Sequence, residues 1–272
     1  MLNRYGITRA AHQALSADTY DLQSIPPNVR SITTITDDVK KKILEKRHLE
    51  EAKRKIDCQN DTWMVLGSAA HYLMEQALAG DSSFMTEERW IMDTETWDLW
   101  WITDSPIPIE VNKWYRGDRQ YLTGKLDCYD RNDHVIEDYK TAKTNKLAFP
   151  LPDSYVWQIN AHKLALDIAG LPVKKGVITY IFRNWEKYDI TKNRFPTPPI
   201  KSCGVALYDN DTIKKFIRDR IRLFVEMEQR EDDDIPECEN RYHKNGRCLS
   251  NEPALWCYCR LWCHYYRGLI EQ

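Results

Sequence analysis

The stretch from Leu122 to Thr141, LTGKLDCYDRNDHVIEDYKT, constrains the fold more than any other part of the chain. Residues 122–129 and 134–139 each alternate apolar with polar side chains, and a polar turn at 130–133 separates them. Two short alternating runs around such a turn predict a β-hairpin. The chain must therefore contain antiparallel β-structure near its middle.

Charged residues gather at one end of this hairpin. Residues two apart share one face of a strand, so Asp138 and Lys140 should point the same way with Tyr139 opposed. The hairpin also brings Asp127 close to them across the ladder. Paired charges on a hairpin often form nothing more than a solvated face. Two carboxylates and an ammonium at one sheet edge would also suit a divalent cation, a water and a phosphodiester.

Length and composition bound the function classes. A chain of 272 residues can bury a substantial core as one large domain, with or without an appendage. The net charge of −2 gives no global basic field, although a DNA enzyme needs only a local basic patch. We find no apolar run that could span a bilayer and no secretory signal, and the eight cysteines favour reduced or ligating thiols. A cytoplasmic protein without a membrane partner is expected.

The remaining pattern predicts helices and strands in alternation. Residues 31–36 suggest a short extended segment, and residues 39–56 a helix rich in lysine and arginine. That helix is either a salt-bridged solvated one or a phosphate-facing surface. Further elements are expected as a helix at 62–80, strands within 87–121, a helix at 153–170, strands at 174–185 and 203–208, and a helix at 212–230. This order predicts an α/β fold, a mixed central β-sheet flanked by helices.

Four more polar residues stand out in these elements. His71 and Glu75 lie four residues apart and so share one face of the helix at 62–80. Gln158 and His162 have the same spacing in the helix at 153–170. A lone histidine on such a helix is more often packed than ligating. Glu110 lies in an otherwise apolar strand, where a buried carboxylate needs a partner or a metal.

Together these motifs resemble one family. They are G-x-x-x-H-x-x-x-E at Gly67, His71 and Glu75, G-x-x-D at Gly124 and Asp127, D-Y-K-T at 138–141, and Q-x-N-A-H at 158–162. In this order they are similar to the PD-(D/E)XK nuclease superfamily, in its RecB-like branch. That branch includes AddB nuclease domains, CRISPR-associated exonucleases and phage exonucleases. The likeness covers roughly residues 60–190.

The resemblance implies a restriction-endonuclease-like core and roles for named residues. Asp127 and Asp138 would hold Mg²⁺ or Mn²⁺, with His71 joining the metal site and the Tyr139 carbonyl as a further ligand. Lys140 would orient or activate the attacking water, and Gln158 would contact the site or the DNA backbone. Supporting roles fall to Glu75 and Glu110. The family usually has tyrosine at the position of His162, which leaves the role of that residue open.

The C-terminal segment carries a cluster of cysteines at Cys238, Cys248, Cys257, Cys259 and Cys263. Five of the eight cysteines in one segment suggest a metal site, with free buried thiols as the alternative. The resemblance implies a [4Fe–4S] cluster, for which Cys58 is an alternative ligand. Zn²⁺ is the other candidate, and His243 or His264 could then replace a cysteine.

The resemblance also implies a division of the chain and a function. The division is an N-terminal helical region at 1–60, a nuclease core at 61–235 and a cysteine-rich segment at 236–272. The expected function is a metal-dependent exonuclease acting on single-stranded DNA or duplex ends, in phage or mobile-element recombination or repair. DNA is the expected partner, together with a recombination protein. A structure-specific or restriction-type endonuclease and a non-catalytic DNA-binding protein on a nuclease fold are the alternatives.

Overall fold

A mixed β-sheet forms the centre of the structure and confirms the predicted α/β fold. The computed structural model describes residues 8–9, 26–51, 62–102, 115–191, 198–238 and 262–263. Within these residues seven strands join in one sheet, in the order β3-β2-β4-β5-β6-β7 with β1 paired to β4. The strands are β1 Val29–Ser31, β2 Phe84–Asp93, β3 Leu99–Ile102, β4 Tyr121–Asp130, β5 Val135–Ala142, β6 Lys175–Phe182 and β7 Ile200–Val205.

The strand directions make the sheet mixed. β2 runs antiparallel to β3 and β4, and β4 runs antiparallel to β5. β5 and β6 are parallel, joined by a crossover through a helix, and β7 is antiparallel to β6. β1 pairs in parallel with the first residues of β4. β4 therefore has neighbours on both sides at each of its ends.

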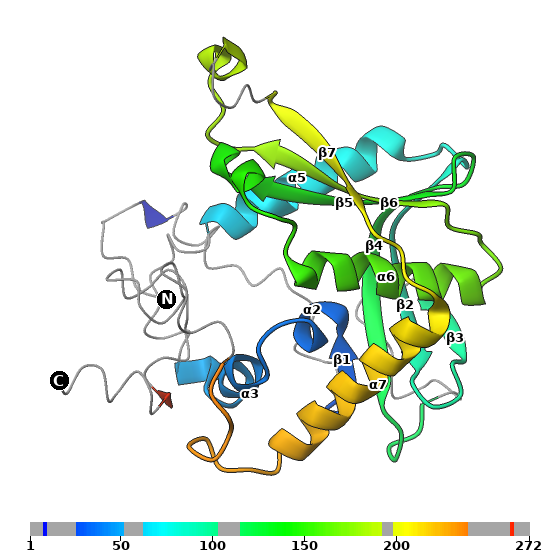
Figure 1. Cartoon of the computed structure of the whole chain (residues 1–272), viewed down its shortest axis with the longest axis vertical. Coiled ribbons are helices and arrows are strands. Elements are labelled where there is room, and N and C mark those ends of the chain that lie inside the picture. Colours follow the sequence, from blue (N-terminus) through cyan, green and yellow to red (C-terminus); the bar gives the residue numbers. More distant parts are fainter. Residues whose placement is uncertain are drawn as a thin grey trace. The chain divides into compact units, whose positions relative to one another are not determined.

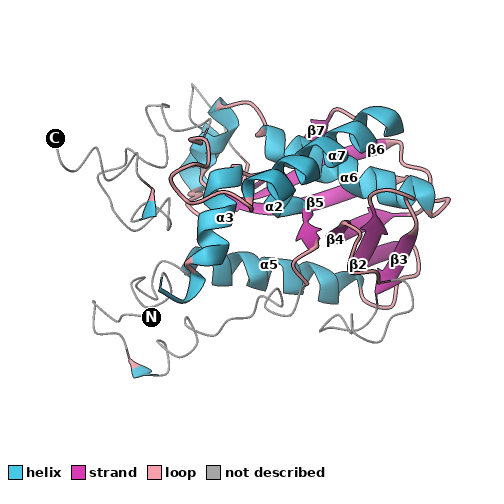
Figure 2. Ribbon diagram, turned by 90° about the horizontal axis from the view of Figure 1, so that it is seen from below, coloured by secondary structure: helices cyan, strands magenta, loops and turns pink. Residues whose placement is uncertain are grey.

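Helices lie on both faces of this sheet. Figures 1 and 2 show α5 along one face, with α6 on the opposite face. The α-helices are α2 Ile32–Ile35, α3 Val39–Arg47, α5 Thr62–Leu78, α6 Asp153–Ile168 and α7 Asn210–Met227, with short 3₁₀ turns at η4 Thr144–Ala148 and η5 Lys187–Thr191. Glycines with positive φ follow α5 and α6, at Gly80 and Gly170. Glycine adopts this left-handed conformation without steric cost, which explains why both helices end there.

Two short N-terminal elements differ from the sequence-based expectation. Residues 31–36 were expected to be extended, but the strand β1 ends at Ser31 and α2 follows at once. The Ser31 hydroxyl accepts a hydrogen bond from the backbone N–H of Thr34 at 3.1 Å and so caps the first turn. The β-branched residues of the ITTI segment masked this short helix in the sequence. α2 contacts both α6 and β4.

The predicted hairpin is present, and its side-chain alternation shifts in the middle of β4. Leu126 and Tyr129 are three residues apart, yet both belong to the main core, with Ile136 of β5 and Ile159 of α6. Strict alternation would place residues three apart on opposite faces. The alternation therefore breaks at residues 127 and 128, and Asp127 lies at this irregularity in β4.

A glycine allows close packing on the α6 side of β4. A Cβ atom added at Gly124 would lie 2.6 Å from Cζ2 of Trp90 and 2.8 Å from Cδ1 of Ile32. Trp90 is fully buried. Any side chain at position 124 would therefore displace the indole ring or α2. The glycine of the G-x-x-D motif is thus explained by packing.

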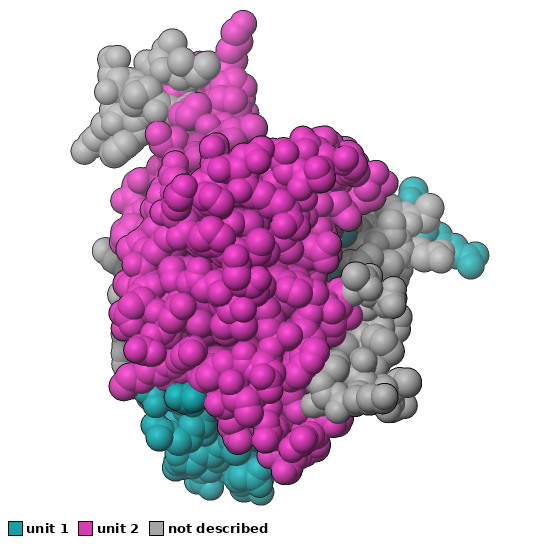
Figure 3. All heavy atoms as spheres, turned by 90° about the vertical axis from the view of Figure 1, so that its right-hand side faces the viewer, with its two compact units in different colours: residues 1–20, 37–65, 218–272 teal, residues 21–36, 66–217 magenta. Residues whose placement is uncertain are grey.

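The chain divides into two compact units, shown in Figure 3. One comprises residues 21–36 and 66–217 and contains the sheet; the other comprises residues 1–20, 37–65 and 218–272. The predicted division at residues 60 and 235 stays a prediction. None of the described helices combines the length and apolar character that a bilayer crossing requires.

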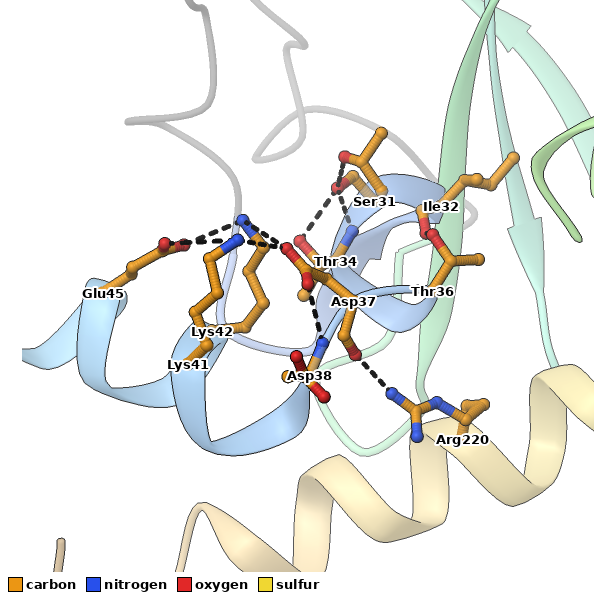
Figure 4. Close-up of polar contacts among 11 residues, drawn as sticks. Ser31, Ile32, Thr34, Thr36, Asp37, Asp38, Lys41, Lys42, Glu45 and Arg220 are labelled. Carbon is orange, nitrogen blue, oxygen red and sulfur yellow. Dashed lines mark hydrogen bonds and ion pairs between the residues drawn. The ribbon is translucent and has the colours of Figure 1, made fainter. Parts of the chain in front are cut away.

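The second unit shows how the basic residues of α3 are used. Lys41 Nζ lies 2.5 Å from Asp37 Oδ2, and Lys42 Nζ lies 2.8 Å from Glu45 Oε2, as Figure 4 shows. Lys40 is buried and donates to the carbonyl of Ile235 at 2.7 Å. These contacts fit the salt-bridged alternative for the described part of the predicted basic helix. Residues 52–56 lie outside the described residues.

The packing at Gly124 yields a stability prediction. Gly124→Ala should lower the free energy of unfolding by about 1–3 kcal/mol, the usual cost of overpacking a core. Gly204→Ala in β7 is the matched control, because a Cβ there meets no atom within 4 Å. Urea denaturation of both variants measures the difference. Equal stability of the two variants would contradict the packing account.

Candidate metal centre

The candidate site lies where β4 and β5 separate, which we call the β4–β5 fork. The ladder between these strands ends at the pair Cys128 and Glu137. Asp127 and Asp138 are the next residues on each strand. Beyond this point the backbone N–H of Tyr139 donates to Asp127 Oδ2 at 2.8 Å. The side-chain carboxylate of Asp127 therefore accepts the hydrogen bond that a backbone carbonyl of β4 would accept in a continued ladder.

Three side chains from different elements converge beside the fork. They are His71 of α5, Glu87 of β2 and Asp127 of β4, and one ligand atom from each lies within 4.8 Å of the others. His71 Nδ1 is 3.4 Å from Asp127 Oδ1 and 3.5 Å from Glu87 Oε1. The structure thus brings together the predicted His71 and Asp127, with α5 and β4 supplying them. We call this group the triad.

The other nitrogen of His71 faces the backbone. Its Nε2 lies 3.1 Å from the carbonyl oxygen of Tyr139, so an Nε2–H group can donate to that oxygen. Nδ1 then faces Asp127 and Glu87, and it would lose its proton when a metal binds there. Metal-binding histidines are commonly oriented by such a hydrogen bond from the nitrogen that does not bind. In this geometry the Tyr139 carbonyl orients the imidazole, whereas the sequence suggested it as a metal ligand.

Glu87 is the member of the triad that sequence reasoning missed. It lies opposite Asp127 in the constant register between β2 and β4. Its φ of 56° is unusual for a residue other than glycine, and such backbone strain tends to persist at functional sites. Lys125 on β4 forms an ion pair with the Glu87 carboxylate. The sequence EERW offered no signal to separate Glu87 from Glu88.

A second group of predicted residues adjoins the triad on the α6 side. Asp138 is buried, and its Oδ2 lies 2.5 Å from Lys140 Nζ. Its Oδ1 accepts a hydrogen bond from Gln158 Nε2 at 2.8 Å. The ammonium of Lys140 also lies 5.4 Å from the ring centroid of Tyr155. The predicted residues therefore gather in two adjoining groups, and Asp138 lies outside the triad.

Electrostatic coupling links the two groups. Hydrogen bonds with Asp127 and Glu87 raise the pKa of His71 to about 10, against the opposing effect of burial. Burial raises the pKa of Asp138 to about 6, and the Asp127 carboxylate adds to this despite Lys140. Burial would lower the pKa of Lys140, but Asp138 and Asp127 outweigh it and raise that pKa. The carboxylates at the fork thus hold His71 and Lys140 in their charged forms.

The donor set of the triad fits a divalent cation. Two carboxylates and one imidazole nitrogen are ligands that Mn²⁺ accepts, and carboxylates also suit Mg²⁺. Ligand atoms at about 2.1 Å from one ion lie at most about 4.2 Å apart, so the atoms of the triad need close by only a fraction of an ångström.

The predicted supporting residues have different outcomes. Glu75 is half-buried on α5 and is not part of the triad. Glu110 lies outside the described residues. His162 is buried in the core, where its Nδ1 accepts a hydrogen bond from Trp90 Nε1 at 3.1 Å. Burial lowers the pKa of His162 to about 4. It is a neutral packing residue, which answers the question left open by the sequence.

The cysteine segment is described only in part. Cys238 is half-buried and Cys263 is buried. Cys58, Cys248, Cys257 and Cys259 lie outside the described residues, as do His243 and His264. The [4Fe–4S] cluster and its Zn²⁺ alternative therefore stay predictions.

Comparison with known proteins supports the fold. No family model matches the chain, and no curated protein matches it. The crystal structure of SSO0001 superposes with a TM-score of 0.50 at 18% sequence identity, covering 79% of this chain and 85% of that chain. At this level of identity the likeness concerns the fold alone.

The buried His162 yields a prediction for pH-dependent stability. Its pKa is about 4 in the folded chain and about 6.5 when unfolded, so the unfolded state binds the extra proton between these values. Its contribution to stability is therefore complete above pH 6.5 and is lost as the pH falls towards 4. The slope due to this residue is at most about 1.4 kcal/mol per pH unit.

His162→Gln keeps an acceptor for Trp90 but cannot titrate. Urea denaturation of both proteins between pH 4 and 7 should show a shallower pH dependence in the variant. Parallel curves for the two proteins would mean that His162 is protonated equally in the folded and unfolded states.

Proposed function

We propose that this protein is a metal-dependent DNA exonuclease of the RecB-like branch of the PD-(D/E)XK superfamily. The observation that carries the proposal is the convergence of His71, Glu87 and Asp127 at the fork, directly beside the Asp138–Lys140 pair. The order of the sequence motifs and the mixed sheet support the same proposal. Hydrolysis of phosphodiester bonds is the reaction for which these groups are suited.

Each group has a task that follows from its surroundings. The triad would hold Mg²⁺ or Mn²⁺, which supplies Lewis-acid stabilisation of negative charge on a phosphodiester. Lys140 stays charged because two carboxylates surround it, so its ammonium can donate to a water or to a phosphate oxygen. Asp138 keeps that ammonium in place at 2.5 Å, and Gln158 in turn fixes Asp138. Lys140 therefore acts as a donor and a source of positive charge.

One experiment separates the candidate functions. The protein is incubated with end-labelled linear DNA and with closed circular DNA, in Mg²⁺, Mn²⁺ or EDTA. We expect cleavage of linear DNA from its ends, protection of the circle, and complete loss of activity in EDTA. Cutting of the circle would identify an endonuclease. Binding without cleavage in any metal would instead favour a DNA-binding protein on a nuclease fold.

Lys140→Ala tests the role of the ammonium. The variant should stay folded and bind DNA but lose about 10²–10³-fold in kcat, as expected when one charge-stabilising donor is removed. Lys143→Ala is the control, because it removes the same charge at an exposed position three residues away. Rates on labelled linear DNA measure both. A Lys140→Ala enzyme as fast as this control would remove the lysine from the mechanism.

Glu87→Gln tests the composition of the triad. Replacing a carboxylate ligand by an amide should weaken Mn²⁺ binding at least tenfold in isothermal titration calorimetry. Glu75→Gln makes the same chemical change on α5, outside the triad, and should leave the affinity unchanged. If Glu75→Gln proved the weaker binder, the supporting role predicted from sequence would be right and the triad wrong.

A further inference from the structure

Two basic residues face each other beside the triad. Arg89 of β2 and Lys125 of β4 are direct partners in the antiparallel ladder between these strands. Side chains at directly opposed positions lie on the same face of the sheet, about 5 Å apart at Cβ. Like charges in such a pair repel and destabilise the sheet. The presence of two cationic side chains at these opposed positions is therefore not explained by a contribution to the stability of the sheet.

The surroundings of the two cations differ. Lys125 is paired with Glu87, yet its side chain keeps 47% of its surface exposed. Arg89 is half-buried, and its side chain has no hydrogen bond, ion pair or ring contact within the described part of the chain. A guanidinium that only decorates a solvated face normally lies fully exposed or beside an acidic residue. Arg89 does neither, so among the described residues its charge has no counterion.

The location of the pair indicates which anion. Arg89 follows Glu87 by two residues on β2, and Lys125 precedes Asp127 by two residues on β4. Two residues of a strand span about 7 Å, and residues two apart share a face. The ion pair between Lys125 and Glu87 places the basic pair and the triad on the same side of the sheet. An anion held by the pair would thus lie next to a phosphate bound to a cation at the triad.

We propose that Arg89 and Lys125 bind the backbone phosphate of DNA adjacent to the phosphate that lies at the triad. This inference rests on the proposed nuclease function and adds the residues that position its substrate. Arginine suits the task because its planar fork can donate two hydrogen bonds to one phosphate. Contacts with phosphates do not distinguish the bases, so this pair would bind DNA without sequence preference. The two strands that carry Glu87 and Asp127 would thereby also fix the position of the DNA strand relative to the triad.

Binding without catalysis tests this assignment. Fluorescence anisotropy with a labelled single-stranded oligonucleotide and the matching duplex, in EDTA, gives the affinity over a series of salt concentrations. Arg89→Gln should weaken binding and reduce the slope of log affinity against log salt by about 0.7 for single strands, the effect of one lost phosphate contact. Arg89→Lys should restore part of the affinity. Lys125→Gln should reduce the slope as well.

Lys201→Gln provides the charge-matched control. Lys201 is exposed on β7, four strands away from β2 in the sheet order, and its removal should change neither affinity nor slope. Arg89→Gln that binds like Lys201→Gln would overturn the phosphate contact. A wild-type protein that binds neither DNA in EDTA would overturn it too. Cleavage of linear DNA by the wild type decides the proposed function separately, because the binding assay contains no metal.

Discussion

The separation of β4 from β5 after Cys128 and Glu137 is the constraint on which the rest of the site depends. A strand that leaves its neighbour exposes backbone N–H groups that need partners. Asp127 satisfies the first of them, at Tyr139, and is thereby fixed where it faces α5. Asp138, one step away on β5, is left on the α6 side with Lys140. One break in the hydrogen-bond ladder thus assigns the two acidic residues to two different groups.

The first half of β4 is closely packed on its α6 side. α2 lies against β4 and α6, and Gly124 lets Ile32 and Trp90 approach the backbone more closely than any side chain would permit. The indole of Trp90 is held in turn by His162. The edge of β4 beyond the fork is paired with β1 at residues 121–123, while β5 stays paired with β6 along its whole length. The fork therefore lies between the part of β4 that pairs with β5 and the part that pairs with β1.

The sequence was sufficient for the hairpin, the order of elements and the closeness of Asp127 to His71, because these follow from alternation, helical spacing and ordered motifs. It was insufficient for Glu87, whose role depends on a left-handed backbone and on a register between distant strands. The Tyr139 carbonyl stays a predicted metal ligand, and its contact with His71 Nε2 could not be foreseen because a motif does not fix which imidazole nitrogen meets which group. Glu75 shares a helix face with His71, but helical periodicity does not show which residues of the sheet will lie beside His71.

The two sides of the fork divide the chemistry between them. On the α5 side, an imidazole and two carboxylates form a site for a cation, and Arg89 and Lys125 follow on the same two strands. On the α6 side, the buried Asp138 forms an ion pair with Lys140, and Asp138 and Asp127 together raise the pKa of that lysine. Tyr139 lies between Asp138 and Lys140 in the chain, and its backbone contacts the α5 side, since its N–H donates to Asp127 and its carbonyl accepts from His71. Residues 138–140 of β5 thus carry Asp138 and Lys140 and also hydrogen-bond to two members of the triad. In the proposed hydrolysis a cation held by the triad would therefore keep a fixed distance from Lys140. A fixed distance matters because small errors in the placement of reacting groups cost large factors in rate.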